Sequence, residues 1–456
     1  MSLRHPDSDH RHRPVGRLRP LTAAGALFCA ALSLAPTVTP ASAQELPAAA
    51  PESVGMSAER LERVDSVMQG LVATRYIPGA VTMVLRDGKV VYSKAVGHRD
   101  IESRAQMQTD AIFRIASQTK AIVSVAIMML EEEGALQIAS PVSRYLPSFE
   151  RTTVAVPRPE GGYDVVAARR PITLRDLLTH TAGIGYGSGP GGDRWAEASM
   201  TGWYFAHRDE PIRATIDRMP ALPFQAQPGE AYVYGYNTDI LGAVVEAVSG
   251  RELDDFLRER IFEPLDMRDT HFYLPPAKLA RLATVYGAQR TGRGWTLTRA
   301  QDGAGMHAQG QYVEGPRRSF SGGAGLLSTA RDYSRFLQMM LNGGELDGAR
   351  ILSPTTVDLM TRNHVGQLYA QAGSAGMGFG LGFSVRMDPG AAGVHGSVGE
   401  FGWGGAYHSS YWVDPVENLV VVYFTQVIPA AGRDDHAALR SLVYAAVTQS
   451  RARPIH

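Results

Sequence analysis

A serine and a lysine three residues apart stand at the start of a strongly apolar stretch. Ser117 and Lys120 precede residues 121–130, in which Ser124 is the one polar side chain, and Glu-Glu-Glu-Gly at 131–134 ends the stretch. Residues i and i+3 share a helix face, so the hydroxyl and the amine can approach each other. A lysine whose pKa is depressed by burial or nearby cations can remove a serine proton. The spacing predicts an active-site helix, although a helix-capping serine beside a solvated lysine would give the same pattern.

Length and composition allow a large core and argue against a nucleic-acid partner. The chain has 456 residues, is 44% hydrophobic and has a formal net charge of zero. No basic cluster follows the N-terminal segment, so we expect no nucleic-acid binding. Cys29 is the single cysteine, no His-Glu-x-x-His occurs, and His180, His395 and His408 lack ligand spacing with a partner. The sequence therefore predicts no disulfide, no metal site and no cofactor.

The first 43 residues have the composition of a secretory signal peptide. Arginines and histidines between residues 4 and 19 precede an apolar run at 21–34, and the small residues Ala41 to Ala43 come before Gln44. The run is too short to span a membrane, and the small residues predict cleavage after Ala43. We expect an exported protein, periplasmic or secreted, without a stable membrane anchor after cleavage.

Strand and helix patterns at both ends of the mature chain enclose a mostly helical middle. A helix capped by Ser57 precedes strands at 79–86 and 89–96, which the hairpin turn at Asp87-Gly88 joins. Further strands are predicted at 381–387, 406–413 and 419–426, and a last helix from about 434 to 447. Helical patterns lie at 171–183, 240–248, 253–261 and 330–341, and a glycine-rich loop that would overhang the site lies at 183–192.

This order predicts an α/β (α+β) fold built on an antiparallel sheet. We expect one discontinuous domain over residues 44–456, with the sheet formed by about 50–100 and 378–450. Terminal helices would flank the sheet, and a mostly helical region at about 105–375 would be inserted.

Two further stretches suit serine chemistry. Tyr234 lies in a tyrosine-rich loop before a predicted helix, and Trp403-Gly-Gly405 lies in a glycine-rich segment. With Ser-x-x-Lys, Leu-Leu-Thr-His-Thr-Ala-Gly at 177–183 and Gly-Gly-Ala-Gly-Leu-Leu-Ser-Thr at 322–329, these stretches resemble the class C β-lactamase superfamily of serine hydrolases. That superfamily includes penicillin-binding proteins, D-aminopeptidases and the family VIII carboxylesterases, which similarly carry Trp-Gly-Gly.

The resemblance implies a β-lactamase/transpeptidase-like fold and a role for each motif. Ser117 would be the acylated nucleophile, Lys120 its partner and Tyr234 the general base, because a phenol beside an ammonium is pushed toward phenolate. Tyr232 and Tyr236 are alternatives to Tyr234, but the spacing to the following helix favours Tyr234. The N–H groups of Ser117 and Ala406 would form the oxyanion hole. The residues expected to contact substrate are Tyr236, Trp403, Gly404 and Gly405.

Two departures from the β-lactamase pattern favour an ester substrate. The β-lactamase loop normally reads Tyr-Ser/Ala-Asn, whereas Gly235 and Tyr236 follow Tyr234, and Trp403 stands where those enzymes have the cation of Lys-Thr-Gly. A neutral tryptophan edge suits a neutral acyl ester better than a lactam carboxylate. Arg317 or Arg318 could supply the missing cation from a loop.

We therefore expect an exported serine hydrolase that forms an acyl-enzyme on Ser117, first of all a carboxylesterase acting on small acyl esters. One alternative is a β-lactamase or D-amino-acid peptidase or carboxypeptidase that uses the same residues on a small-molecule amide. Another is an inactive module that binds cell-wall peptide. No Gly-x-Ser-x-Gly elbow occurs, which disfavours an α/β-hydrolase.

Overall fold

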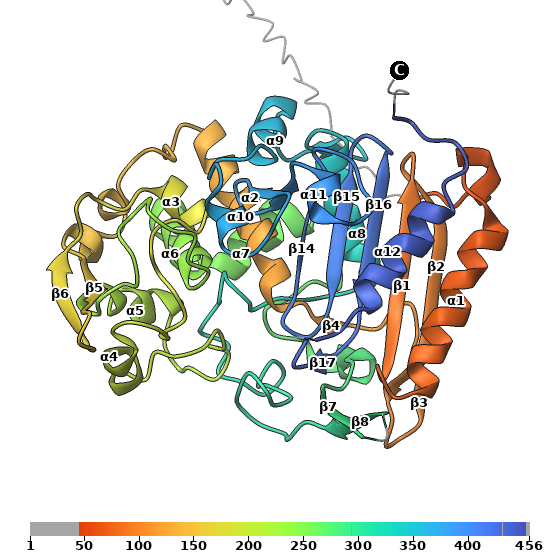
Figure 1. Cartoon of the computed structure of the whole chain (residues 1–456), viewed down its shortest axis with the longest axis horizontal. Coiled ribbons are helices and arrows are strands. Elements are labelled where there is room, and N and C mark those ends of the chain that lie inside the picture. Colours follow the sequence, from red (N-terminus) through yellow and green to blue (C-terminus); the bar gives the residue numbers. More distant parts are fainter. Residues whose placement is uncertain (1–44, 293, 431, 453–456) are drawn as a thin grey trace, which may run out of the picture. The chain divides into compact units, whose positions relative to one another are not determined.

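The main feature of the computed structural model is an eight-stranded antiparallel sheet. Its long strands run roughly from top to bottom in Figure 1. The structure describes residues 45–292, 294–430 and 432–452, so the predicted signal peptide lies outside it. The strand order is β12-β13-β14-β15-β16-β1-β2-β3. The bounds are β1 (Gly79–Arg86), β2 (Lys89–Asp100), β3 (Ala105–Gln106), β12 (Met377–Phe379), β13 (Ser384–Arg386), β14 (Phe401–Gly404), β15 (Ser410–Asp414) and β16 (Leu419–Phe424). Segments from both ends of the described chain thus form one sheet.

Strand β1 is an interior strand of this sheet, between β2 and β16. All eight of its residues are buried, which explains its nearly continuous apolar sequence. Arg86 pairs with Lys89 across the hairpin, and the two turn residues, Asp87 and Gly88, adopt φ of +50° and +72°. These angles belong to a type I′ turn, so the hairpin prediction at Asp87-Gly88 is confirmed.

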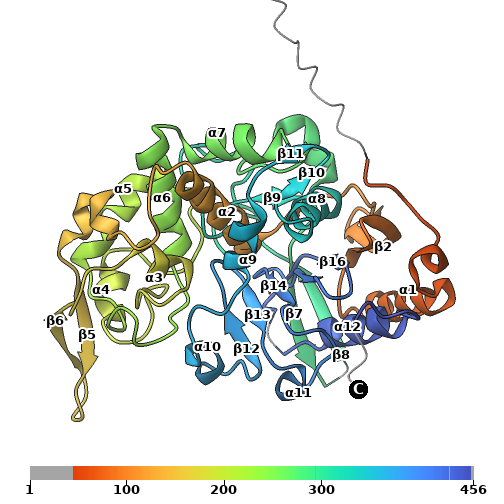
Figure 2. The ribbon, with the colours of Figure 1, turned by 90° about the horizontal axis from the view of Figure 1, so that it is seen from above.

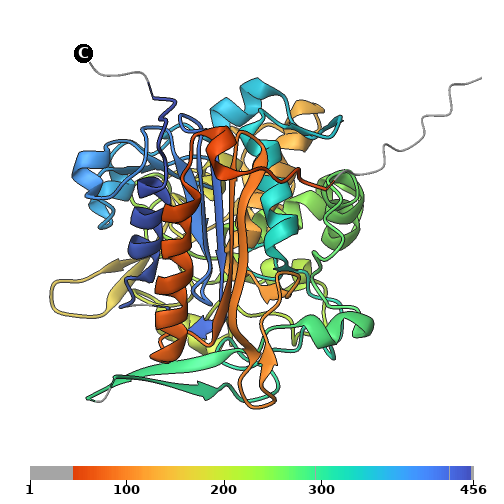
Figure 3. The same ribbon diagram turned by 90° about the vertical axis from the view of Figure 1, so that its right-hand side faces the viewer.

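Two helices cover one face of the sheet and two cover the other. Figure 3 shows α1 (Ala58–Ala73) beside α12 (Asp435–Ala445), with α8 (Ala330–Leu341) on the opposite face. Alternate residues of each strand face opposite sides, so Val421 packs toward α1 and α12 while Val422 packs toward α8 and α2 (Thr119–Glu132). The predicted sheet with flanking terminal helices is confirmed.

The inserted region is mostly helical and lies away from α1 and α12 (Figure 2). Its helices are α3 (Leu174–Leu178), α4 (Gly192–Glu197), α5 (Ile212–Ile216), α6 (Asn237–Ser249), α7 (Leu253–Leu257), α9 (Pro354–Met360) and α10 (Leu368–Gln371); α11 (Pro389–Ala392) follows β13. Short turns of 3-10 helix are Pro51–Val54, Ala116–Gln118, Val142–Arg144, Pro147–Glu150, Met219–Ala221 and Pro276–Arg281, and Arg258–Phe262 is a π-helical turn. Four small sheets pair β4 (Phe113–Arg114) with β9 (Leu327–Ser328), β5 (Thr153–Pro157) with β6 (Tyr163–Ala167), β10 (Glu345–Leu346) with β11 (Ala349–Arg350), and β7 (Tyr286–Thr291) with both β8 (Gly294–Arg299) and β17 (Val427–Ile428).

The predicted strands near the C-terminus are wrong in their boundaries. The predicted strand at 381–387 contains only β13, because residues 381–383 lie in the turn between β12 and β13, where Gly382 adopts φ +94°. The predicted strand at 406–413 starts only at Ser410, and Trp403 lies in β14, which was not predicted. Glycines break the alternation that marks a strand, and β14 holds two of them in four residues. In the described ranges, no helix has both the length and the apolar character needed to cross a membrane.

Candidate active site

Ser117 lies where the short strand β4 turns into the buried helix α2. Residues Ala116–Gln118 form the turn, and Ala116 adopts φ +43°, an uncommon value for a residue with a Cβ atom. Such a conformation costs about 1–3 kcal/mol and persists only where the surroundings impose it. Ala116 and Gln118 are buried, whereas Ser117 between them is partly exposed. The strained turn therefore presents the serine side chain at the surface of the core.

The Lys120 ammonium is surrounded by hydrogen-bond acceptors. Its Nζ donates to the Gly323 carbonyl at 2.7 Å and to the Tyr186 hydroxyl at 3.0 Å, and it lies 3.5 Å from the Ser117 hydroxyl. It also stands 4.6 Å from the centre of the Tyr234 ring. Among the described residues, no carboxylate lies within 4.0 Å of it. The predicted approach of serine and lysine is thus present in the structure.

Tyr234 joins the same cluster through its hydroxyl and its ring. Trp403 Nε1 donates to the Tyr234 hydroxyl at 3.2 Å, and the two ring centres are 5.4 Å apart. Of the three tyrosines in this loop, Tyr234 is the one whose ring faces Lys120. The structure therefore brings Ser117, Lys120, Tyr234 and Trp403 together.

Tyr186 is a site residue that the sequence prediction missed. It lies in the glycine-rich loop at 183–192, of which it is the one aromatic residue, and its ring packs edge-on against Tyr234 at 5.7 Å. Burial, with Tyr234 and Asp239 nearby, raises the pKa of Tyr186 well above its usual value. Tyr186 therefore stays a neutral phenol that orients Lys120. The lone aromatic in a loop predicted to overhang the site was the available signal.

The buried side chain of Asp239 positions Lys120 indirectly, through Gly323. Asp239 Oδ1 accepts hydrogen bonds from the Gly323 N–H at 3.0 Å and from the Ser321 hydroxyl at 2.5 Å. A Cβ on Gly323 would lie 2.2 Å from Asp239 Oδ2, so only glycine fits there. Burial raises the pKa of Asp239, and the charge of Lys120 lowers it. Asp239 thus fixes the Gly323 carbonyl, which holds the lysine.

Two backbone N–H groups are available beside Ser117. Within the described ranges, neither the Ser117 N–H nor the Ala406 N–H donates to a protein acceptor. Gly405 packs directly on the segment before Ser117, because a Cβ on it would lie 2.5 Å from the Ile115 carbonyl oxygen. This close approach places the turn that carries Ala406 next to the serine, as an oxyanion hole requires.

A model described as Beta-lactamase matches residues 64–445 of the chain. The chain belongs to the beta-lactamase family. Esterase EstB of Burkholderia gladioli is 32% identical over 396 residues, which cover 84% of this chain and 95% of EstB. The lovastatin esterase of Penicillium rubens is 31% identical over 395 residues, 81% of this chain and 94% of that protein. The solved structure of EstCE1, a hydrolase with promiscuous acyltransferase activity, is 29% identical and superposes with a TM-score of 0.73, covering 84% of this chain and 98% of EstCE1.

Membership of the beta-lactamase family confirms two predictions. The fold is β-lactamase/transpeptidase-like, and the protein is a serine hydrolase.

The structure does not bring Tyr236 to the site as predicted. Its side chain is fully buried, its hydroxyl donates to the Gly202 carbonyl at 2.6 Å, and its ring stacks on Trp195 at 5.7 Å. Tyr236 is the N-cap residue of α6, and its ψ of 2° is not extended, so its side chain does not follow the direction of Tyr234. Tyr236 packs the loop against the core, while Trp403, Gly404 and Gly405 remain at the site.

The two arginines considered as substitutes for the missing cation also lie elsewhere. Arg317 Nη2 donates to the Leu274 carbonyl at 2.9 Å, and Arg318 pairs with Asp209 at 3.3 Å. Neither contacts Ser117 or Trp403.

An aromatic wall continues from Tyr234 along one side of the site. The ring-centre distances are 5.4 Å for Phe379 and Trp403, 6.2 Å for Tyr369 and Trp403, and 4.7 Å for His180 and Tyr234. Burial and the charge of Lys120 hold the pKa of His180 well below its usual value, so its Nδ1 accepts from Asn237 Nδ2 at 2.8 Å. The wall is therefore uncharged.

A histidine–aspartate pair holds the turn that carries Ala406. His408 adopts φ +68°, and its Nε2 donates to Asp435 of α12 at 2.6 Å. His408, Asp435 and His436 have potential metal-ligand atoms within 4.8 Å of one another. The two imidazoles, however, are stacked at 4.1 Å with nearly parallel planes, and Tyr423 occupies the second Asp435 oxygen. A metal ion bound by both imidazoles would have to lie in both ring planes, which parallel stacked rings do not allow. The group therefore acts as a hydrogen-bonded latch, that is, a set of hydrogen bonds that ties the turn carrying Ala406 to α12.

Proposed function

We propose that this serine hydrolase is a carboxylesterase that cleaves small acyl esters through an acyl-enzyme on Ser117. The observation that carries the proposal is the neutral Trp403 edge, which binds Tyr234 where a lactam carboxylate would need a cation. The uncharged aromatic wall beside it suits an apolar acyl or alcohol group. Two relatives that are named esterases support the same substrate class.

The geometry supports a two-step mechanism. Ser117 Oγ attacks the ester carbonyl while its proton passes to the Lys120–Tyr234 pair, and the N–H groups of Ser117 and Ala406 stabilise the oxyanion. Collapse of the tetrahedral intermediate breaks the bond to the alkoxide, which takes the proton from Tyr234 and leaves as the alcohol. Water then attacks the acyl-enzyme and gives its proton to the same pair; the bond to Ser117 Oγ breaks, Oγ takes that proton back, and the acid is released. Tyr186 and Gly323 keep the amine in place throughout.

A substrate panel tests this proposal. A lactam or D-amino-acyl carboxylate without a cation loses a contact worth about 1.5–3 kcal/mol, or about one to two powers of ten in kcat/KM. Purified protein beginning at Gln44 should therefore turn over p-nitrophenyl acetate or butyrate with a higher kcat/KM than any penicillin, cephalosporin or D-alanyl-D-alanine peptide. A cephalosporin hydrolysed more efficiently than every ester would establish the lactamase alternative instead.

Active-site labelling separates an enzyme from an inactive peptide-binding module. A fluorophosphonate should add to Ser117, as read by mass spectrometry of the tryptic peptide, and Ser117→Ala should abolish both labelling and turnover. Absence of labelling in the parent protein would favour the inactive module.

We also propose that the protein is exported and that residues 1–43 are removed. The apolar run and the small residues Ala41 to Ala43 support this. N-terminal sequencing of secreted material should begin at Gln44; secreted material that still begins at Met1 would refute the cleavage.

A further inference from the structure

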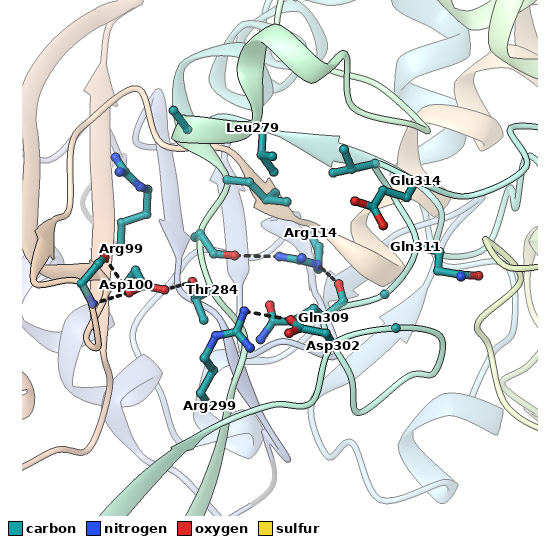
Figure 4. Close-up of a pocket in the computed structure, with 17 residues that line it drawn as sticks. Arg99, Asp100, Arg114, Leu279, Thr284, Arg299, Asp302, Gln309, Gln311 and Glu314 are labelled. Carbon is teal, nitrogen blue, oxygen red and sulfur yellow. Dashed lines mark hydrogen bonds and ion pairs between the residues drawn. The ribbon is translucent and has the colours of Figure 1, made fainter.

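A cavity of about 560 Å³ lies apart from the Ser117 cluster (Figure 4). It is lined by the end of β2, the segment around 279–284 and the segment from 299 to 314. Its volume is within the range of small-molecule sites. None of Lys120, Tyr234 and Trp403 lines it, so it is not the substrate site proposed above.

Arg114 lines this cavity and is 3% exposed. Its Nε donates to the Gln309 carbonyl at 2.7 Å, and its Nη1 donates to the Ala283 carbonyl at 2.6 Å. Among the described residues, no carboxylate lies within 4.0 Å of the Arg114 guanidinium, and all ion pairs there are formed by other arginines, lysines and histidines. Burial accordingly lowers the pKa of Arg114. A buried charge without a counterion is costly, so an anion from outside the chain would stabilise it.

One nitrogen of Arg114 remains available to such an anion. Nη2 has no hydrogen-bond partner among the described residues. The equally unpartnered Nη1 of Arg386 is fully enclosed by protein atoms, whereas Nη2 of Arg114 is not. Because the Arg114 side chain lines the cavity, the open edge of Nη2 faces it. A guanidinium N–H binds a carboxylate oxygen through a strong, charge-assisted hydrogen bond.

The charges of the wall favour a ligand with one negative charge, because three arginines (Arg99, Arg114 and Arg299) are matched by three carboxylates (Asp100, Asp302 and Glu314). Asp302 is neutralised by Arg299 at 2.8 Å, and Asp100 accepts a hydrogen bond from Thr284 at 2.8 Å. Glu314 is exposed at the rim and would oppose a phosphate dianion. The remaining lining combines polar side chains, among them Ser103 and Gln311, with an apolar group formed by Leu279, Leu282, Ala283 and Val313. These features fit a carboxylate head on a short apolar chain.

We propose that this cavity binds a small organic monocarboxylate. Its carboxylate accepts a hydrogen bond from Arg114 Nη2, and its chain lies against Leu279, Leu282 and Val313. Arg114 precedes Ser117 by three residues on the strand that leads into the catalytic turn, so the bound acid would stiffen the base of that turn.

Calorimetric titration with butyrate tests the proposal, with butyramide as the uncharged control at the same ionic strength. We expect one butyrate per chain and about tenfold weaker binding of butyramide, because a charge-assisted hydrogen bond exceeds a neutral one by about 1–1.5 kcal/mol. Equal affinity for acid and amide, or no saturable binding at millimolar butyrate, would overturn it.

A charge variant at the cavity mouth locates the binding without disturbing the bonds of Arg114. Leu279 is 51% exposed, so Leu279→Glu and Leu279→Gln should both fold. Leu279→Glu should weaken butyrate binding severalfold relative to Leu279→Gln, because the added carboxylate repels the ligand. Equal affinities in these two variants would place the acid elsewhere, for example at Ser117, and refute the site.

Discussion

Gly235 lets two active-site loops touch, and a single methyl group there should disable the enzyme. An ideal Cβ on Gly235 would lie 2.4 Å from the Ile184 carbonyl oxygen and 2.4 Å from the Gly185 carbonyl carbon, against an ordinary contact of at least 3.4 Å. Gly235→Ala must therefore separate the two backbones by about 1 Å. Gly185 adjoins Tyr186, whose hydroxyl orients Lys120, so the shift reaches the catalytic groups.

Two magnitudes follow from this overlap. Overpacking of a core costs about 1–3 kcal/mol of unfolding free energy. A displacement of about 1 Å in a catalytic group can lower the rate about 100-fold. We expect Gly235→Ala to lower kcat/KM for p-nitrophenyl butyrate by about one to two powers of ten and to reduce the urea midpoint. The φ of Gly235 lies outside the left-handed region, so steric contact alone is responsible.

Gly70→Ala provides the matched control. Gly70 is exposed on α1, and no atom lies within 4 Å of its ideal Cβ. The same substitution there should raise unfolding free energy by about 0.5–1 kcal/mol and leave kcat/KM unchanged. If Gly235→Ala keeps both parental activity and parental stability, the inferred contact between the loops is wrong.

Four further substitutions test other parts of the structure. Lys120→Arg should lower kcat nearly as much as Ser117→Ala, because arginine keeps the charge but cannot act as a base; near-parental esterase turnover would exclude the role of Lys120. Tyr186→Phe should lower kcat by about tenfold, the worth of one hydrogen bond, with little change in KM; an unchanged kcat would show that the phenol is dispensable. Burial raises the pKa of Glu246 to about 7 from 4.5, so unfolding free energy should fall as pH rises between these values, and urea titrations of Glu246→Gln should lack that fall. His408→Gly fits φ +68° without strain but loses the bond to Asp435, so kcat should drop although the chain folds; parental kcat would mean that the latch does not position Ala406.

Local patterns in the sequence predicted much of the fold and part of the site. The cap at Ser57 and the turn at Asp87-Gly88 are both present, because each depends on residues within a few positions of one another. The approach of Lys120 to Ser117 follows from one helical turn in the same way. The boundaries of β14 and β15 could not be predicted, because glycine-rich strands lack a strong local preference and form through pairing with neighbours.

The sequence alone determined which groups could do chemistry, namely the Ser117–Lys120 pair, the tyrosine loop and the Trp403 segment. Only the tertiary structure decided which tyrosines reach the lysine. Tyr186 contacts Lys120 across 66 residues, while Tyr236, two positions from Tyr234, turns into the core. The physical reason is that spacing rules operate within one turn or one strand. Contacts between distant segments depend on how closely the backbones pack, and here glycines such as Gly235 set that distance.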